Sequence, residues 1–363
     1  MPQARPATQR IAALDILRGL ALLGMILVHF HQLLERAPAA PTWLDEAEGW
    51  FVWLFVEGKS WGVFAMLFGA GFALMARGLA ARGEPVGRIM ARRFLSLAVI
   101  GAALQVGTGF HVLMDYAVSG FWLLLLHRRS TRTLLIAAAI AASLTVLYAL
   151  AQGAHVRRLD EDARAVHVAR READRQAARA RQERLATAEQ GPSYAALVAA
   201  RWEGFVAAKR QWRAYAPGID LALLIVGLLA VRHGVVEDPL GRRRLLLRAM
   251  GLGFASWVVG RALMHGVPDT FSVGPLQAWM IQGGLGLVRD QWLCLTYAGA
   301  VLLLLASRPA WHRRLASFGV VGRMAFTAYV LQVVALDAMR AGYGLSLRIR
   351  PAATPLATAL LFG

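Results

Sequence analysis

The sequence is poor in cysteine, lysine and acidic residues. Its single cysteine, Cys294, excludes an intrachain disulfide and any metal site built from several cysteines, so we expect no metal. The chain has 22 acidic residues against 40 basic ones, which gives a formal net charge of +18, and only Lys59 and Lys209 are lysines. It also has no detectable internal repeat, which transporters built from two similar halves would show.

Apolar residues are abundant instead. They make up 57% of the 363 residues, and the mean hydropathy is +0.48. This composition predicts an all-α, polytopic integral membrane protein that lies in a lipid bilayer. A basic chain can bind nucleic acid, but these arginines lie mostly between apolar runs, where they determine topology, and we expect no nucleic-acid partner. About ten spans are predicted, near residues 12–33, 59–77, 92–109, 113–127, 132–150, 217–231, 245–264, 290–306, 318–338 and from 352 onward.

The charge of the loops orients these spans. Arg5 and Arg10 precede the first span, whereas acidic residues dominate the loop after it, so we expect a cytoplasmic N-terminus in a bacterial inner membrane. The later arginine-rich loops also fall on the cytoplasmic side, provided that the glycine-rich segment 272–288 does not cross the membrane. We therefore expect this segment to be re-entrant or interfacial. No cleavable signal peptide is evident, because the first apolar run is long.

Composition divides the chain into three parts. Residues 1–153 form a five-helix membrane half with the candidate site, residues 154–215 an insert, and residues 216–363 a second membrane half. From His155 to Gln190 the insert is dense in charged residues and has no helix breaker, which predicts a solvated extracytoplasmic helix of about 30 residues. The aromatic segment that follows, with Trp202, Phe205, Trp212 and Tyr215, suits the membrane surface. A coiled-coil contact with a partner is the alternative interpretation of the long helix.

Three ionisable residues interrupt the first span, namely Asp15, Arg18 and His29. Arg18 and His29 are eleven positions, or three helical turns and roughly 16 Å, apart, so they share one face of a helix. Because an ionisable group inside a membrane costs about 3 kcal/mol or more, such residues usually face a protein interior and have a function. Alternatively, Asp15 and Arg18 neutralise each other and ease insertion.

Five further ionisable residues fall at the outer end of the membrane with His29, by the predicted topology: His31, which can also be a loop residue at the interface, and Glu57, Lys59, His111 and Asp115. Each also has a structural interpretation, as a helix anchor or as a pair that tightens a turn. His29 is the strongest candidate for a general base, because imidazole titrates near neutral pH. Near the last complete span, we expect Arg323 to be a positive-inside anchor and Gln332 to bond a neighbouring helix.

Four blocks of the sequence resemble the YeiB-like bacterial membrane proteins, a domain of unknown function. They are LDILRGLALLGMILV at 14–28, EGKSWGVFAMLFGAGF at 57–72, YAVSG at 116–120 and GRMAFTAYVLQ at 322–332. That family looks related to the membrane acyltransferases, which include the type-3 acyltransferases and heparan-α-glucosaminide N-acetyltransferase. These enzymes take an acyl group from cytoplasmic acyl-CoA and deliver it to an acceptor across the membrane.

The resemblance carries over unevenly at the candidate residues. Arg18 and His29 match the type-3 acyltransferase pattern of an arginine followed eleven residues later by a histidine, whereas YeiB-like chains usually have asparagine where His29 stands. Glu57 and Lys59 match the glutamate-glycine-lysine of the YeiB-like second span. The carry-over therefore favours acyltransferase chemistry at His29.

Two features of the YeiB-like pattern are missing. Its histidine near the end of the third span falls at Leu104, and its glycine-aspartate pair falls at Phe110-His111, with Asp115 a turn later. Its terminal block of glycine, proline, glutamate and tryptophan is also absent. Whether the second membrane half is truncated at its end therefore stays open.

The sequence thus predicts a membrane O- or N-acyltransferase, although whether the chain is an enzyme stays open. Arg18, Arg92 and Arg93 would bind the phosphates of acyl-CoA, because guanidinium groups suit phosphate. His29 would activate a glycan, lipid or small-molecule acceptor outside the cell, with Glu57, Lys59, His111 or Asp115 assisting. The alternatives are a transporter of an anionic metabolite or lipid and a non-catalytic assembly protein. Whether the chain forms a homo-oligomer is also open.

Overall fold

The computed structural model describes residues 7–34, 41–110, 112–211, 215–266 and 292–362. Helices make up nearly all of this part of the chain, which confirms the predicted all-α membrane fold. The first membrane half contains α1 (Ala7–Leu33), α2 (Trp43–Phe51), the short π-helix η1 (Val52–Val56), α3 (Lys59–Ala81), α4 (Val86–Thr108), α5 (Val112–Leu126) and α6 (Thr131–Arg158). The insert contains α7 (Glu161–Gln190) and α8 (Tyr194–Lys209).

The second membrane half begins with α9 (Ile219–Arg232) and α10 (Arg243–Gly266). After a helix at Trp292–Ser307 come α12 (Ala310–Arg314), α13 (Ala316–Arg323), α14 (Ala325–Arg340), the 3-10 turn η3 (Pro351–Ala353) and α15 (Thr354–Phe362). Local sequence explains several helix starts. The side chains of Thr42, Ser130 and Asp160 each accept a hydrogen bond from a backbone N–H in the first turn that follows.

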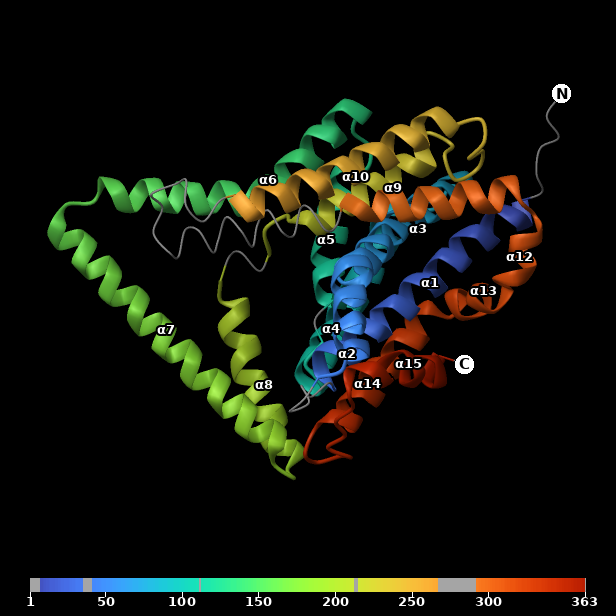
Figure 1. The fold of residues 1–363 in the computed structure, drawn as a ribbon. Coiled ribbons are helices and arrows are strands. Elements are labelled where there is room, and N and C mark those ends of the chain that lie inside the picture. The colour runs from blue at the N-terminus through green and yellow to red at the C-terminus, as the bar shows by residue number, and fades with distance from the viewer. Residues whose placement is uncertain (1–6, 35–40, 111, 212–214, 267–291, 363) are drawn as a thin grey trace.

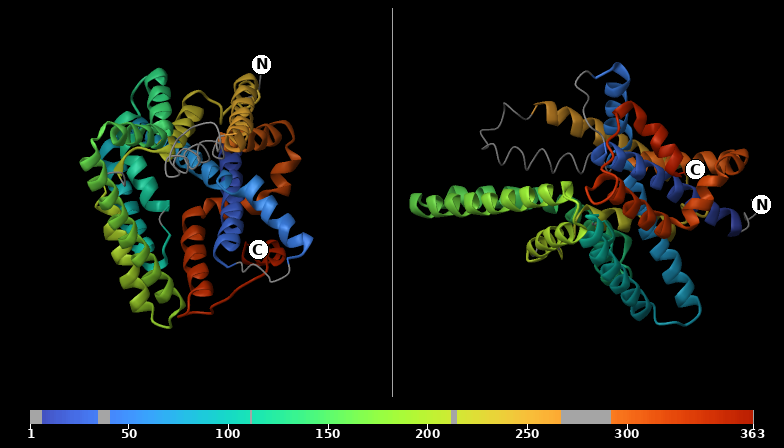
Figure 2. Two further views of the ribbon diagram at one scale, coloured as in Figure 1. Left: turned by 60° about the vertical axis from the view of Figure 1, so that its left-hand side comes forward. Right: turned by 90° about the horizontal axis from the view of Figure 1, so that it is seen from below.

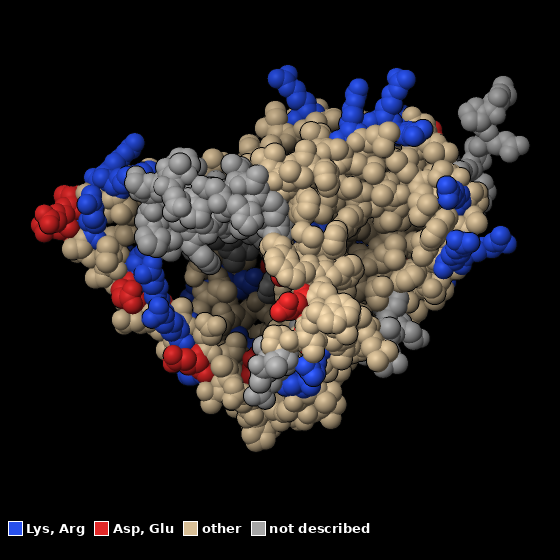
Figure 3. Space-filling view, viewed as in Figure 1, with Lys and Arg blue, Asp and Glu red and all other residues tan. Residues whose placement is uncertain are grey.

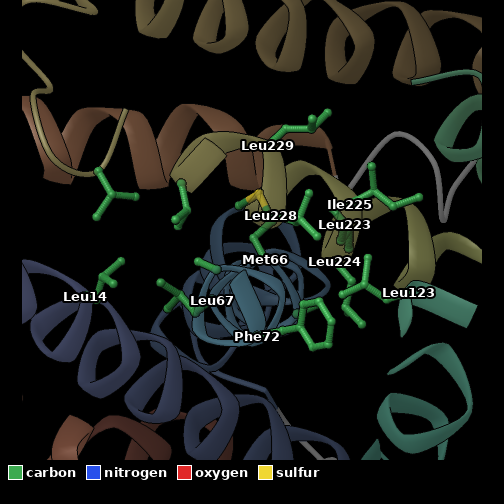
Figure 4. Close-up of a cluster of buried hydrophobic side chains, with 14 of the residues drawn as sticks. Leu14, Met66, Leu67, Phe72, Leu123, Leu223, Leu224, Ile225, Leu228 and Leu229 are labelled. Atoms are coloured by element: carbon green, nitrogen blue, oxygen red, sulfur yellow. The ribbon is translucent and has the colours of Figure 1, made fainter. Parts of the chain in front are cut away.

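The packing of α3 against α9 forms the centre of the core. Gly69 of α3 faces the Leu224 backbone, and Gly227 of α9 faces the Met66 backbone, with no room for a methyl group at either glycine. Because both glycines lack a side chain, the two helix backbones come close together, as small residues permit in membrane helices. Figure 4 shows α9 crossing α3, with Met66, Leu67, Leu224 and Leu228 among the buried side chains at the crossing.

The predicted number of about ten spans is not confirmed. In the described residues, three segments are long and apolar enough to cross a membrane: Ala12–Leu33, Trp43–Ala81 and Val86–Thr108. A fourth is possible if α13 and α14 are counted together. The helices at 112–126, 131–144 and 292–307 are apolar but shorter. The segment 272–288 lies outside the described residues.

The span predicted at 318–338 is not a single helix. The chain bends there by 83° between α13 and α14. Gly322, at the end of α13, lies against the Asp15 backbone of α1, where a side chain would have no room, and Gly19 of α1 lies equally close to Phe318. Packing of α13 along α1 therefore sets the direction of α13, and α14 leaves at a new angle.

The final apolar run is also shorter than a span. The α15 helix begins at Thr354 and has 9 residues, so it rises about 14 Å, roughly half the hydrocarbon thickness of a bilayer. It lies beside α1, as Figure 1 also indicates.

The insert is only partly separate from the other helices. Figures 1 and 2 show α7 standing apart from the helical body along most of its length as an arm, whereas α8 packs against α4. The α7 helix has 30 residues and none of them is buried, which agrees with the solvated helix expected up to Gln190. Arg184 of α7 and Glu203 of α8 form an ion pair at 2.6 Å. The side-chain hydrogen bond from Arg184 lowers the pKa of Glu203. Trp202 is exposed on α8, whereas Trp212 lies outside the described residues.

Candidate functional site

Asp15 and Arg18 form an ion pair one turn apart on α1, with 2.7 Å between Oδ1 and Nη1. Asp15 is buried, whereas the Arg18 side chain is 26% exposed. The pair fits the interpretation of mutual neutralisation, but Arg18 also lines a cavity. Gly71 of α3 lies beside the Arg18 guanidinium, since a Cβ at this position would meet Nη2 at 3.3 Å. Arg18 can therefore pair with Asp15 and still meet a ligand.

The cavity beside Arg18 has a volume of about 690 Å³. It lies between α1, α3, α4, α5, α13 and α14 and is lined mainly by aromatic and aliphatic side chains. Among these are Phe64, Phe68, Phe72, Phe94, Phe326, Leu97, Leu113, Tyr116 and Tyr329. An apolar pocket of this size with a few polar groups is typical of a small-molecule site.

Arg18, Arg92, Arg93 and Arg323 all line this cavity, and they come from three different helices. We call this side of the molecule the arginine end. The structure thus brings together the three arginines that the sequence analysis assigned to a donor, and it adds Arg323. In the described part of the chain, Arg92, Arg93 and Arg323 pair with no carboxylate. Uncompensated guanidinium groups around an apolar cavity attract an anion such as phosphate.

Two tyrosines line the cavity among its apolar side chains. Tyr116 is fully buried, and its hydroxyl donates to the backbone carbonyl of Trp61 at 3.4 Å. Tyr329 is 1% exposed, and among the described residues its hydroxyl has no hydrogen-bond partner. A buried polar group without a partner costs about 1–3 kcal/mol, so the Tyr329 hydroxyl is an unsatisfied group that a ligand could satisfy.

His29 lies beyond the cavity, in the last turns of α1. Its Nδ1 is 2.9 Å from Nε2 of Gln332 on α14, and its ring meets the Phe110 ring edge-on at 4.7 Å between centroids. The expected contact of Gln332 with a neighbouring helix is confirmed, and the neighbour is His29. Phe110 also packs against the apolar cluster that contains Met25 and Tyr329, and this cluster borders the cavity. We call this side of the molecule the histidine end.

Two other candidate residues, Glu57 and Lys59, have separate local partners. Glu57 accepts a hydrogen bond from Gln32 at 2.7 Å. Lys59 is fully buried, and its ammonium donates to the backbone carbonyl of Trp53 at 2.9 Å. Asp115 is partly buried in the first turn of α5, and His111 lies outside the described residues. Among the described residues, no group of three or more histidine, cysteine or acidic side chains could hold a metal ion.

A buried ion pair that the sequence analysis missed joins the insert to the histidine end. Arg201 of α8 and Asp337 of α14 are 3% and 1% exposed and are bonded through two pairs of atoms, at 2.9 and 2.5 Å. Arg201 also donates to the Gly107 carbonyl of α4. The Tyr343 hydroxyl donates to Asp337 at 3.0 Å, and burial, together with this carboxylate, raises the pKa of Tyr343 to about 12. The phenol therefore stays a donor at physiological pH.

The sequence held only a weak signal for this pair. Arg201 looked like one of many arginines of the insert, and Asp337 like a charge at the end of a span. A lone acidic residue in an apolar run is a reason to expect a buried partner, but the partner is 136 positions away. Spacing along the chain could not have identified it.

The fold and the site together define an all-α membrane protein with an arginine-lined cavity. Two family descriptions match the chain: residues 10–156 match "Heparan-alpha-glucosaminide N-acetyltransferase, catalytic", and residues 230–362 match "Protein of unknown function (DUF418)". These matches confirm the predicted resemblance to the YeiB-like proteins and to the membrane acyltransferases. The chain is therefore a membrane protein that is similar, over residues 10–156, to an acyltransferase catalytic domain.

Two curated relatives are similar to this chain. An "uncharacterized 39.9 kDa protein in amylase 3'region" of Bacillus acidopullulyticus is 40% identical over 93 residues, which cover 26% of this chain and 27% of the relative. The "uncharacterized protein YxaH" of Bacillus subtilis is 25% identical over 96% of this chain and 87% of its own length. No solved structure matches the chain.

Proposed function

We propose that the protein is a bacterial inner-membrane acyltransferase with its arginine end at the cytoplasm. It takes an acyl group from cytoplasmic acyl-CoA and transfers it to a hydroxyl or amine of an extracytoplasmic acceptor. One observation carries the proposal. A single cavity joins Arg18, Arg92, Arg93 and Arg323 to an apolar interior that borders the histidine end. The match of residues 10–156 to an N-acetyltransferase domain supports the same chemistry.

The dimensions of the site suit a long donor. Eleven residues of α1 separate Arg18 from His29, which is a rise of roughly 16 Å and shorter than an extended pantetheine arm. The four arginines would hold the phosphates, and the arm would lie among the aromatic side chains. The nucleotide could then stay at the arginine end while the thioester reaches the histidine end.

His29 is the proposed general base. It removes a proton from the acceptor hydroxyl or amine as the acceptor atom bonds to the acyl carbon, and the carbon–sulfur bond breaks to release the thiolate, which is then protonated. Gln332 is the proposed positioning residue. When its amide oxygen faces His29, it accepts a hydrogen bond from Nδ1–H, and Nε2 is then the ring nitrogen that accepts the proton.

Thiol release in proteoliposomes tests this function. With acetyl-CoA as donor and glucosamine as an acceptor with both hydroxyl and amine groups, wild type should release free thiol. His29→Ala should lower the rate about 10²- to 10⁴-fold, which is the usual contribution of a general base. Arg93→Ala should raise the KM for acetyl-CoA, because a phosphate contact is lost.

Each variant has a control of the same residue type, and the arginine control is also on the same helix. Arg88→Ala removes an exposed arginine of α4 that does not line the cavity, and His155→Ala removes an exposed histidine of α6, so both should keep the wild-type rate. Full activity of His29→Ala, or no acetyl-CoA binding by wild type, would overturn the proposal. Uptake of the donor without thiol release would favour a transporter instead.

A further inference from the structure

The Tyr329 hydroxyl is the one polar group of the described cavity lining that is both buried and without a hydrogen-bond partner. The comparable hydroxyl of Tyr116, in the same cavity, already donates to the Trp61 carbonyl. Tyr329 is held in place from several sides, because it packs with Leu22 and Met25 of α1 and Leu113 of α5 in one apolar cluster. A fixed donor without an acceptor, in an apolar cavity, is prepared for a ligand oxygen.

Tyr329 also lies next to the histidine end. Gln332, which contacts His29, follows Tyr329 by three residues on α14, so the two side chains share one helix face and are about 4.5 Å apart along the axis. On the facing helix, Met25 precedes His29 by four residues and packs in the same cluster as Tyr329. The Met25–Tyr329 layer is thus one turn closer to the arginine end than the His29–Gln332 layer.

We propose that the Tyr329 hydroxyl donates a hydrogen bond to the carbonyl oxygen of the acyl-CoA thioester, at the end of the cavity nearest the histidine end. This inference rests on the proposed acyltransferase function and assigns the one charge-stabilising group that the function lacks. The arginines bind the far end of the donor, and His29 acts on the acceptor, so neither meets the oxygen on which negative charge develops. Tyr329 supplies a donor for that oxygen.

For an acceptor hydroxyl, transfer begins with attack on the acyl carbon. The acceptor oxygen bonds to the acyl carbon while His29 takes its proton, and the carbonyl electron pair moves to the carbonyl oxygen. The Tyr329 hydroxyl keeps its own proton and stabilises this oxyanion through the hydrogen bond. When the carbonyl re-forms, the carbon–sulfur bond breaks, and the electron pair leaves with the thiolate. Tyr329 is neither oxidised nor consumed.

Removal of the hydroxyl alone tests the assignment. In Tyr329→Phe, we expect kcat for thiol release from acetyl-CoA to fall about 10²-fold, as for the loss of one oxyanion donor, with little change in acetyl-CoA affinity. The second readout is the infrared carbonyl stretch of bound acetyl-CoA labelled with ¹³C at the thioester carbon. This band should lie at lower frequency in wild type than in Tyr329→Phe, because a hydrogen bond weakens the carbonyl bond.

Tyr116→Phe is the matched variant, since it removes an equally buried hydroxyl from the same cavity, and its carbonyl band should stay at the wild-type frequency. If wild type releases thiol but Tyr329→Phe keeps both its kcat and its carbonyl band, the Tyr329 assignment is overturned while the proposed function stands. A lower kcat with an unmoved band would also overturn it, because a structural defect would give that result. If wild type neither binds acetyl-CoA nor releases thiol, the proposed function itself fails.

Discussion

At the scale of single residues, the two lysines of the chain occupy opposite surroundings. Lys59 is fully buried at the start of α3, where its ammonium donates to the Trp53 carbonyl. Lys209 lies at the end of α8, with its ammonium 5.9 Å from the centre of the Phe205 ring. In a chain that otherwise uses arginine, a buried lysine indicates a site with room for a compact ammonium and not for a planar guanidinium.

Lys59→Arg should therefore destabilise the protein by about 1–3 kcal/mol, which is the usual cost of overpacking a filled site. Lys209→Arg is the matched control and should be neutral, because arginine makes the same contact with an aromatic ring. Thermal unfolding in detergent measures both. Equal melting temperatures for Lys59→Arg and wild type would contradict the size restriction.

Residue patterns in the sequence predicted part of the site. The spacing of Arg18 and His29 follows from helix geometry alone, and α1 is one continuous helix from Ala7 to Leu33, so their separation needed no further information. Tyr329 could not be selected in this way. Its distinguishing property is a hydroxyl without a partner, and that property depends on every neighbouring helix and not on its own sequence position.

At the scale of elements, α14 connects the three functional regions of the molecule. Its first turns line the cavity through Ala325 and Tyr329, its middle contacts His29 through Gln332, and its end binds the insert through Asp337. The 83° bend before α14 makes this possible, because α13 runs along α1 and α14 then turns toward the insert. Apolar periodicity predicted a span here but not its bend, since close packing of Gly322 on α1 leaves no mark in hydropathy.

The ion pair of Arg201 and Asp337 should hold the insert on α14. Removal of one partner of a buried ion pair lowers the free energy of unfolding by about 3–5 kcal/mol. We expect the loss in Arg201→Met to lie at the lower end of this range, because Arg340 and Tyr343 still bond to Asp337. Hydrogen exchange should increase in α8 and at the end of α7. The double variant Arg201→Met with Asp337→Leu should recover part of the loss, because no unpaired charge remains buried.

Arg184→Met is the control for this experiment. It breaks the exposed ion pair with Glu203 in the same insert, and solvent screens that pair, so hydrogen exchange in α8 should change little. If Arg201→Met and Arg184→Met exchange alike, the buried pair does not hold the insert.

At the scale of the whole molecule, charge is distributed unevenly over the helical body. Figure 3 shows lysine and arginine side chains along the upper edge, where α6 and α10 lie in Figure 1, and along the right-hand edge, where α1 begins and α12 lies. The face between them is mostly uncharged, and acidic and basic side chains alternate along the α7 arm. This distribution suits a body that lies in a bilayer with its arginine end at the cytoplasm and its arm in water on the other side.

Two single substitutions test that orientation. Gly87→Cys places a thiol in open space beside the arginine end, and Ala178→Cys places one on the exposed surface of α7. Wild type is the blank, because Cys294 is fully buried. In spheroplasts, a membrane-impermeant maleimide should label the Ala178→Cys variant at once and the Gly87→Cys variant only after the membrane is permeabilised. The basic content of α7 does not prevent an extracytoplasmic position, because long loops cross the membrane largely regardless of their charge. The reverse order of labelling would place the arginine end outside, where cytoplasmic acyl-CoA cannot reach it.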